Sequence, residues 1–242
     1  MTLQRTRKVM LVLSFLLFPV TFMYLSPVMA LGGTYFGVVS FGLAFWAAVA
    51  LSAPLVGRAF CSWVCPLGGI QMCLGDASGK SLVPVRYLRV AKYQIWAAWV
   101  GSILFLAVKV GGYTGMELMW ENPGFPPYEL GAHIAWLGFS LLPVVLVLLL
   151  GRRAFCHYLC FFSPLNIIGT RVGRWLRLPM LGAHVVAAER CTACQRCSKG
   201  CPMSLDVTGM VKQGAIRHPE CITCGNCAAT CKSDVIRYGM DR

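Results

Sequence analysis

The chain has 242 residues, of which 57% are hydrophobic and only 13% are charged, and its mean hydropathy is +0.65. About a quarter of the residues of an average soluble domain are charged, so this composition excludes an ordinary soluble domain and favours a membrane protein. The formal net charge of +13 does not indicate a nucleic-acid partner. Most basic residues flank apolar segments, where membrane orientation accounts for them.

The first two thirds of the chain are predicted to be a membrane all-α four-helix bundle, in residues 1–165. Each span needs about 20 apolar residues. Residues 9–57 contain no charged side chain and are long enough for two spans, separated by a turn at Gly32-Gly33-Thr34. The four predicted spans are 9–30, 35–56, 93–110 and 133–150.

Basic residues predict the orientation of this bundle, because they collect on the cytoplasmic side of a membrane. They precede the first span and follow the second and fourth, whereas residues 111–131 hold three glutamates and no Lys or Arg. Both termini are therefore predicted to lie on the cytoplasmic side of a bacterial inner membrane. The alternative for the N-terminus is a signal peptide cleaved near Ala30, but the apolar stretch exceeds the usual length of about 7–15 residues.

A cysteine motif occurs twice in the membrane part. Gly-Arg-Ala-Phe-Cys-x3-Cys at residues 57–65 reappears at residues 151–160 with one arginine inserted, so the bundle reads as a tandem repeat of two-helix units. Cysteines four apart share one face of a helix. Two interpretations remain open for this set: a shared metal or cluster site, or thiols that pack or form transient disulfides. The set comprises Cys61, Cys65, Cys156 and Cys160.

The two copies of this motif are not identical, because Phe161 stands where the first copy has proline. Cys73 lies outside both copies and is predicted to be a buried thiol. Residues 166–180 alternate apolar residues with arginines. They are predicted to form an interfacial helix or, alternatively, a basic linker.

Residues 181–242 are predicted to form an α+β ferredoxin-like domain of the bacterial type with two [4Fe–4S] clusters. The spacing C-x2-C-x2-C-x3-C occurs twice, although the second copy ends in Cys231-Lys232 rather than Cys-Pro. In the bacterial arrangement the fourth cysteine of each run ligates the other cluster. A zinc site would instead use two separated pairs of cysteines. The expected ligands are Cys191, Cys194, Cys197 and Cys231 for the first cluster, and Cys201, Cys221, Cys224 and Cys227 for the second.

The paired Gly-Arg-x-Phe-Cys-x3-Cys motifs followed by a two-cluster domain resemble the NapH-type membrane ferredoxin proteins. They are also similar to the membrane iron–sulfur part of the NosR-type regulators. The resemblance implies a quinol dehydrogenase subunit that passes electrons from the quinone pool towards a respiratory reductase. The implied partners are a periplasmic cytochrome or reductase and other ferredoxin-like subunits. The alternative is a membrane redox factor for maturation or regulation of a metalloenzyme.

A quinol pocket is expected between the spans, where Glu129 and His133 are candidates to relay protons. The alternative is that the aromatic residues here anchor the helices at the membrane boundary and that His133 is a solvated end residue. The aromatic residues are Trp96, Trp99, Trp120, Tyr128 and Trp136. Haem is not expected, because His133 and His157 lie near opposite ends of the fourth span. No nucleotide-binding or hydrolase motif is present.

Overall fold

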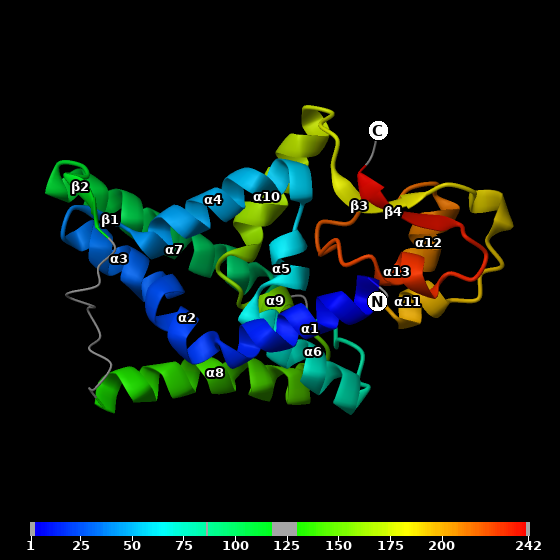
Figure 1. The fold of residues 1–242 in the computed structure, drawn as a ribbon, viewed down its shortest axis with the longest axis horizontal. Coiled ribbons are helices and arrows are strands. Elements are labelled where there is room, and N and C mark those ends of the chain that lie inside the picture. Colours follow the sequence, from blue (N-terminus) through cyan, green and yellow to red (C-terminus); the bar gives the residue numbers. More distant parts are fainter. Residues whose placement is uncertain (1–2, 86, 118–129, 241–242) are drawn as a thin grey trace.

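The structure is a computed structural model that describes residues 3–85, 87–117 and 130–240. It is mainly helical and elongated, with long helices on one side and a small domain of short helices and strands on the other (Figure 1). Residues 181–240, the C-terminal domain, form that smaller part. The remainder, the helical part, contains both copies of the cysteine motif.

The first apolar run is broken by its prolines, so the single helix expected over 9–30 is wrong. Pro19 and Pro27 each lie in the first turn of a new helix, where a proline is tolerated. Ser26 caps the last of these helices by accepting a hydrogen bond from the Val28 amide at 3.2 Å. The chain bends by 72° across the break near residue 18. The three helices are α1 (Leu3–Leu16), α2 (Phe18–Leu25) and α3 (Pro27–Tyr35).

The turn after α3 lies later than the predicted Gly32-Gly33-Thr34. It falls at Phe36-Gly37, where Gly37 has a φ of 71°, a conformation that favours glycine. A short strand, β1 (Val38–Ser40), follows and pairs in parallel with β2 (Gly115–Glu117). The next helix therefore begins at residue 41 rather than at residue 35.

Three further long helices are α4 (Phe41–Val56), α7 (Leu88–Val110) and α8 (Leu130–Leu150). Within the described ranges, α7 is the one unbroken helix that is long and apolar enough to cross a membrane, and the bent segment of α1 with residues 20–35 is a second candidate. The apolar helices at 41–56 and 137–150 are shorter. The four-span bundle thus stays a prediction.

The two copies of the cysteine motif have the same backbone structure. Gly57 and Gly151 end α4 and α8 with φ of 63° and 93°. In both copies the amide of the second cysteine donates to the carbonyl of the phenylalanine five residues earlier, at 2.9 Å in the first copy and 3.0 Å in the second. Each copy then continues into a helix that begins near a Pro-Leu pair. The helices are α5 (Ala59–Trp63) and α6 (Pro66–Ser78), and α9 (Ala154–Tyr158) and α10 (Ser163–Trp175).

The two repeat units interlock, because α6 packs against α8 and α10 packs against α4. Glycines allow the close approach of α10. A Cβ atom at Gly169 would lie 2.6 Å from the Cβ of Ala53, and one at Gly173 would lie 2.2 Å from the carbonyl oxygen of Pro54. Most of residues 166–180, the segment predicted to be an interfacial helix or a linker, therefore belongs to a helix that packs with one face against α4.

The C-terminal domain consists of an antiparallel pair of strands and short helices. The strands are β3 (Leu181–Val185) and β4 (Ile236–Met240), and the helices are η1 (Ala188–Arg190), α11 (Arg196–Lys199), α12 (Val207–Lys212) and α13 (Asn226–Thr230). Ala183, Val207, Val211, Val235 and Ile236 form its apolar core. This α+β arrangement, with its ferredoxin-like cysteine loops, agrees with the prediction for residues 181–242.

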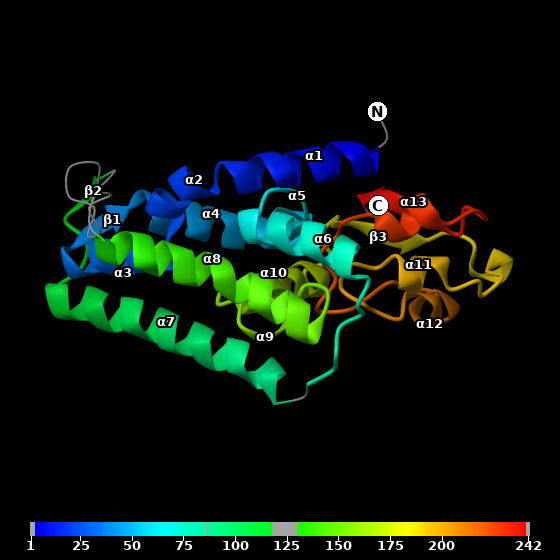
Figure 2. The same cartoon turned by 90° about the horizontal axis from the view of Figure 1, so that it is seen from below.

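Both copies of the cysteine motif lie at the end of the helical part that faces the C-terminal domain, whereas β1 and β2 lie at the opposite end (Figure 2). Several hydrogen bonds tie the domains together here. Gln4 Nε2 donates to the carbonyl of Cys224 at 3.0 Å, and the Thr223 hydroxyl donates to the carbonyl of Val56 at 3.4 Å. Cys73 on α6 is exposed, so the prediction of a buried thiol is wrong.

Candidate iron–sulfur sites

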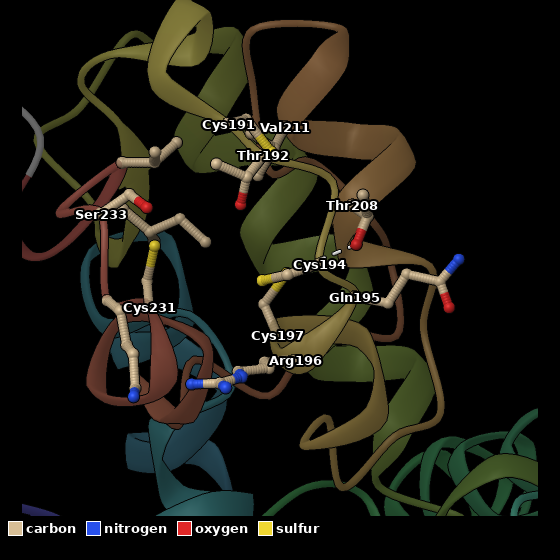
Figure 3. Close-up of a pocket in the computed structure, with 13 residues that line it drawn as sticks. Cys191, Thr192, Cys194, Gln195, Arg196, Cys197, Thr208, Val211, Cys231 and Ser233 are labelled. Carbon is tan, nitrogen blue, oxygen red and sulfur yellow. Dashed lines mark hydrogen bonds between the residues drawn. The ribbon is translucent and has the colours of Figure 1, made fainter.

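Four cysteines of the C-terminal domain line one cavity of about 210 Å³. We call this cavity, formed by Cys191, Cys194, Cys197 and Cys231, the first cluster site. Figure 3 shows these side chains around a common space, with Cys231 contributed from the far end of the second cysteine run. Cys194 is exposed, so this site opens towards the solvent.

The other four cysteines of the domain line a second, smaller cavity of about 20 Å³. The second cluster site consists of Cys201, Cys221, Cys224 and Cys227, and its remaining lining is mostly apolar. Each cavity therefore gathers three cysteines of one run and the last cysteine of the other. These are the groupings expected from the spacing.

The two cysteine runs have similar backbone conformations. The same three positions in each run have a left-handed conformation, with φ between 49° and 69°. In the first run they are Ala193, Gln195 and Ser204, and in the second run they are Thr223, Gly225 and Asp234. The two loops therefore repeat one local geometry. Lys232, which replaces the expected proline, does not alter it.

The four cysteines of the paired motifs lie close enough to influence one another electrostatically. Burial, together with the neighbouring thiols Cys156 and Cys61, raises the pKa of Cys160 to about 12. Burial, followed by the charges of Cys61, Cys156 and Cys160, also raises the pKa of Cys65. We call these four residues the paired cysteines. They come from two different repeat units and lie in surroundings that disfavour free thiolates.

Two buried arginines lie beside the paired cysteines. Arg58 and Arg153 each precede Ala-Phe-Cys in their copy of the motif, and each is 1% exposed. Arg153 donates to the carbonyl of Cys61 at 2.8 Å, while its Nε and second terminal nitrogen have no hydrogen-bond partner in the structure. Both arginines were predicted only as orientation signals. Each arginine stands three residues before the first cysteine of its motif copy, and this repetition was the sequence signal that both side chains could be buried beside the cysteines.

Two buried amide side chains approach the same cysteines from the interlocked helices. Gln71 on α6 donates to Cys156 Sγ at 3.3 Å, and Asn166 on α10 donates to Cys61 Sγ at 3.8 Å. Their carbonyl oxygens are buried without a partner. Thiolate sulfur is negatively charged and accepts hydrogen bonds, so these amide N–H donors and the two buried arginines fit a bound anionic metal–thiolate centre. No sequence pattern pointed to these amides.

An acidic residue beside the second cluster site holds the two domains together. Glu220, which precedes Cys221, accepts a hydrogen bond from Arg58 at 2.9 Å and forms an ion pair with Lys92 on α7. Both cations are 1% exposed. Burial alone would raise the pKa of Glu220, but Arg58 and Lys92 lower it to about 2. Glu220 is therefore ionised and matched by two buried cations.

The second cluster site and the paired cysteines share one apolar cluster. Cys61, Cys156, Met203, Ile222 and Cys224 form one apolar cluster of buried residues, against which Cys201 also packs. One packed cluster thus joins the two sites across the boundary between the helical part and the C-terminal domain. In the residues that the structure covers, no three His, Cys, Asp or Glu side chains converge closely enough to mark a single-ion site.

Aromatic side chains next to the paired cysteines in sequence pack against tryptophans of α4 and α7. The Trp46 ring lies 5.7 Å from Phe60 and 4.5 Å from Phe162, and the Trp99 ring lies 5.1 Å from Phe161. Trp99 was expected near a quinol pocket, whereas the others were not. Phe161 and Phe162 belong to the insertion that displaces the proline of the second motif.

The remaining candidates for the quinol pocket are described only in part. Trp96 lies on α7 with its ring nitrogen buried and without a partner. The backbones of His133 and Trp136 lie on α8, towards the end remote from the paired cysteines. Trp120, Tyr128 and Glu129 lie outside the described residues. In the C-terminal domain, burial lowers the pKa of His218, which is half-buried.

Known proteins match both parts of the chain. A family described as a 4Fe-4S binding domain matches residues 39–84 and 132–179, which are the two repeat units α4–α6 and α8–α10. A family described as a 4Fe-4S dicluster domain matches residues 183–232. The duplication of the helical part and the ferredoxin type of the C-terminal domain are therefore confirmed.

Three curated relatives have similar sequences. The putative electron transport protein YccM of Escherichia coli is 25% identical over an alignment that covers 73% of this chain and 49% of YccM. The regulatory protein NosR of Pseudomonas aeruginosa is 25% identical over 76% of this chain and 25% of its own length. The ferredoxin-type protein NapH of Escherichia coli is 26% identical over 74% of this chain and 60% of its own length.

This chain thus spans less than two thirds of each of these relatives. No solved structure matches it. The matched families and the cysteine cavities nevertheless agree on the chemistry of the chain. It is an iron–sulfur protein of the 4Fe-4S ferredoxin type related to the NapH and NosR proteins, and the resemblance indicated by its cysteine motifs is confirmed.

Proposed function

We propose that this chain is a membrane-bound electron-transfer protein, a quinol dehydrogenase subunit that passes electrons between the quinone pool and a respiratory reductase. The observation that carries this proposal is the shared packing of Cys224 and Cys201 with Cys61 and Cys156. It makes a continuous series of thiol sites from the surface of the C-terminal domain into the helical part. A series of this kind suits electron transfer.

Two [4Fe–4S] clusters occupy the C-terminal domain in this proposal. Cys191, Cys194, Cys197 and Cys231 hold the first, and Cys201, Cys221, Cys224 and Cys227 hold the second, as the lining of the two cavities supports. A bound cluster supplies one-electron oxidation and reduction. The first cluster site is open to solvent, and the second cluster site packs against the helical part.

The paired cysteines bind a further metal or cluster in this proposal. Four cysteine ligands give any such centre a negative charge, which the buried guanidinium groups of Arg58 and Arg153 offset. The amide N–H groups of Gln71 and Asn166, which donate to the cysteine sulfur atoms, and the match of each repeat unit to a 4Fe-4S binding family support the same assignment. Among the described residues no carboxylate pairs with Arg153, so the competing state, a set of neutral thiols, leaves its buried charge uncompensated.

The membrane location rests on the exposed apolar surface of the long helices. On α7, Leu104, Phe105 and Val108 are each at least 60% exposed. Contiguous apolar surface of this extent is unusual for a soluble monomer. Basic residues collect at the end that carries the C-terminal domain. These features support a multi-pass protein of the bacterial inner membrane with both termini and the clusters on the cytoplasmic side.

Quinol is the proposed electron donor, because its two electrons match two one-electron clusters. Phe161, which directly follows Cys160, packs with Trp46 and Trp99 into an aromatic cluster that suits a quinone ring. Glu129 and His133 remain proposed proton carriers. A periplasmic cytochrome or reductase and a ferredoxin-like subunit complete the proposed route.

A second candidate function is a redox factor for the maturation or regulation of a metalloenzyme. One relative is named a regulatory protein, and this name favours that reading over a purely respiratory role. Both functions use the same clusters. They differ in whether quinol reduces them.

The test begins with the full chain, purified in detergent without oxygen. Two clusters give about eight irons per chain, and a metal at the paired cysteines adds to this number. Cys224→Ser should lose the second cluster, whereas Cys73→Ser, which changes an exposed thiol outside all three sites, should keep every metal. An equal metal content in both variants would contradict the assignment.

The second measurement follows cluster EPR while a reduced menaquinol analogue is added, with and without membranes that supply the partner subunits. Reduction of the clusters by quinol supports the quinol dehydrogenase. Clusters that are intact but not reduced under either condition would reject it in favour of the maturation or regulatory role.

A further inference from the structure

A cavity of about 560 Å³ lies where the end of α10 meets the C-terminal domain. Its walls come from α10, from the segment that connects α10 to β3, and from the loop that leads to Cys221. It is distinct from both cluster sites, although Cys221 and Thr223 form part of its lining. The electron-transfer sites described above make no use of this space.

Three arginines line this cavity, and no acidic residue does. We call it the basic cavity, after Arg174 and Arg177 at the end of α10 and Arg217 in the facing loop. Among the described residues, the ion pairs involve Asp76 and Glu220 only, so none of these guanidinium groups is paired with a carboxylate. Burial, followed by the charges of Arg217 and Arg171, lowers the pKa of Arg174. The positive charges of these arginines thus lie near one another with no carboxylate paired to them.

The local backbone holds these arginines in position. Arg177 has a left-handed φ of 53°, and the amide of Leu178 bonds to the carbonyl of Gly173 at 2.9 Å, so the chain turns sharply at the end of α10. This turn places two arginines on one side of the cavity. Arg217 faces them from a segment about 40 residues away in sequence. Arginines from separate segments suit the several oxygens of a phosphate group, which each guanidinium contacts with two donors.

Much of the remaining lining is apolar, although two histidines and two threonines also border the cavity. Leu178, Pro179, Met180, Leu181 and Ile216 all border the cavity. A basic surface beside an apolar surface matches a molecule that has an anionic head and a hydrocarbon tail. The exposed apolar residues Ile168 and Val172 on α10 extend this apolar surface towards the helical part.

We propose that the basic cavity binds a phosphate group, carried by the headgroup of an anionic phospholipid or present as free phosphate. The lipid source rests on the proposed membrane location, whereas binding of free phosphate does not. Because Cys221 lines the cavity, a bound phosphate places negative charge near the second cluster. Negative charge near a cluster disfavours its reduced state, so the ligand lowers the reduction potential of that cluster.

The test compares two double variants of the full chain in detergent. Arg174→Gln with Arg217→Gln removes two charges from the basic cavity. Arg5→Gln with Lys212→Gln removes the same number of charges from exposed residues outside it. Iron content and cluster absorbance establish that both variants are folded and loaded. The probes are phosphatidylglycerol, followed by native mass spectrometry after delipidation, and inorganic phosphate, followed by calorimetry, with diacylglycerol as a lipid without phosphate.

The unmodified chain and the control variant should bind phosphatidylglycerol in preference to diacylglycerol. The cavity variant should bind phosphatidylglycerol at least about tenfold more weakly than the unmodified chain, because two charged hydrogen-bonding groups are lost. Phosphatidylglycerol should also lower the second cluster's potential in an EPR redox titration, except in the cavity variant. Loss of inorganic phosphate binding alone would identify free phosphate as the ligand. Equal losses in both variants, or no binding of either probe to the unmodified chain, would overturn the proposal.

These outcomes are separate from those of the proposed function. Clusters that quinol does not reduce would reject the quinol dehydrogenase and leave a positive phosphate result unchanged. Conversely, reduction by quinol in a chain that binds neither probe would reject only the basic cavity.

Discussion

Glu220 allows a direct test of how the C-terminal domain is fixed to the helical part. Its carboxylate is 14% exposed and lies between Arg58 and Lys92, which are each 1% exposed. Glu220→Gln keeps the shape of the side chain but leaves two buried cations without their counter-ion. Removing one partner of a buried ion pair costs about 3–5 kcal/mol.

For a chain of this size, each kcal/mol lowers the melting temperature by about 2–4 °C. Glu220→Gln should therefore lower it by about 6–20 °C. Loss of cluster absorbance on heating measures the transition in detergent, and tryptophan fluorescence gives a second signal. Glu220→Asp, which retains the charge on a shorter side chain, should recover part of the loss.

The matched control is Asp76→Asn. Asp76 pairs with Lys8 at 3.0 Å, but both side chains are 54% exposed. Such a pair contributes about 0–1 kcal/mol, so its loss should change the melting temperature by about 4 °C at most. Equal shifts for Glu220→Gln and Asp76→Asn would show that Glu220 does not hold the domains together, and would refute the reasoning from burial.

Two glycine substitutions test the close contacts of the fold. Gly173→Ala places a Cβ 2.2 Å from the carbonyl oxygen of Pro54, so α10 must move away from α4 at a cost of about 1–3 kcal/mol. Gly225→Ala requires a left-handed alanine beside the Tyr238 ring, 2.9 Å from its Cβ, and should cost at least about 1–2 kcal/mol with a loss of iron from the second cluster site. Gly32→Ala, which meets no atom within 4 Å, is the control for both. Thermal unfolding and iron content measure the effects, and a Gly32→Ala variant as unstable as the others would contradict this explanation.

The features predicted from sequence are those encoded locally. A cubane takes three thiolates from one short loop, so the spacing of Cys191, Cys194 and Cys197 is visible without a structure. The repeat of Ala-Phe-Cys is equally local, and it predicted that the paired cysteines approach one another. Pro19 and Pro27 also signalled breaks, but proline is tolerated within membrane helices, and so one continuous helix was predicted where the structure has three.

The features that could not be predicted depend on residues far apart in the chain. Glu220 meets Arg58 across 162 positions, and no local pattern distinguishes it from a solvated surface acid. The amides of Gln71 and Asn166 reach cysteines of the opposite repeat unit only because the helices interlock. Such contacts follow from packing, which single-sequence patterns do not encode.

The interlocking of the repeats also explains why the paired cysteines and the second cluster site lie together. Because α6 packs on α8 and α10 packs on α4, each motif is held against the other, and the amides cross between them. Arg58 then contacts both sides of the boundary, since it bonds to Ser163 of the second repeat unit at 2.9 Å and to Glu220 of the C-terminal domain. One buried guanidinium group therefore couples the position of Cys221 to that of Cys61. A centre at the paired cysteines and the second cluster can consequently keep a fixed separation, which an electron-transfer route requires.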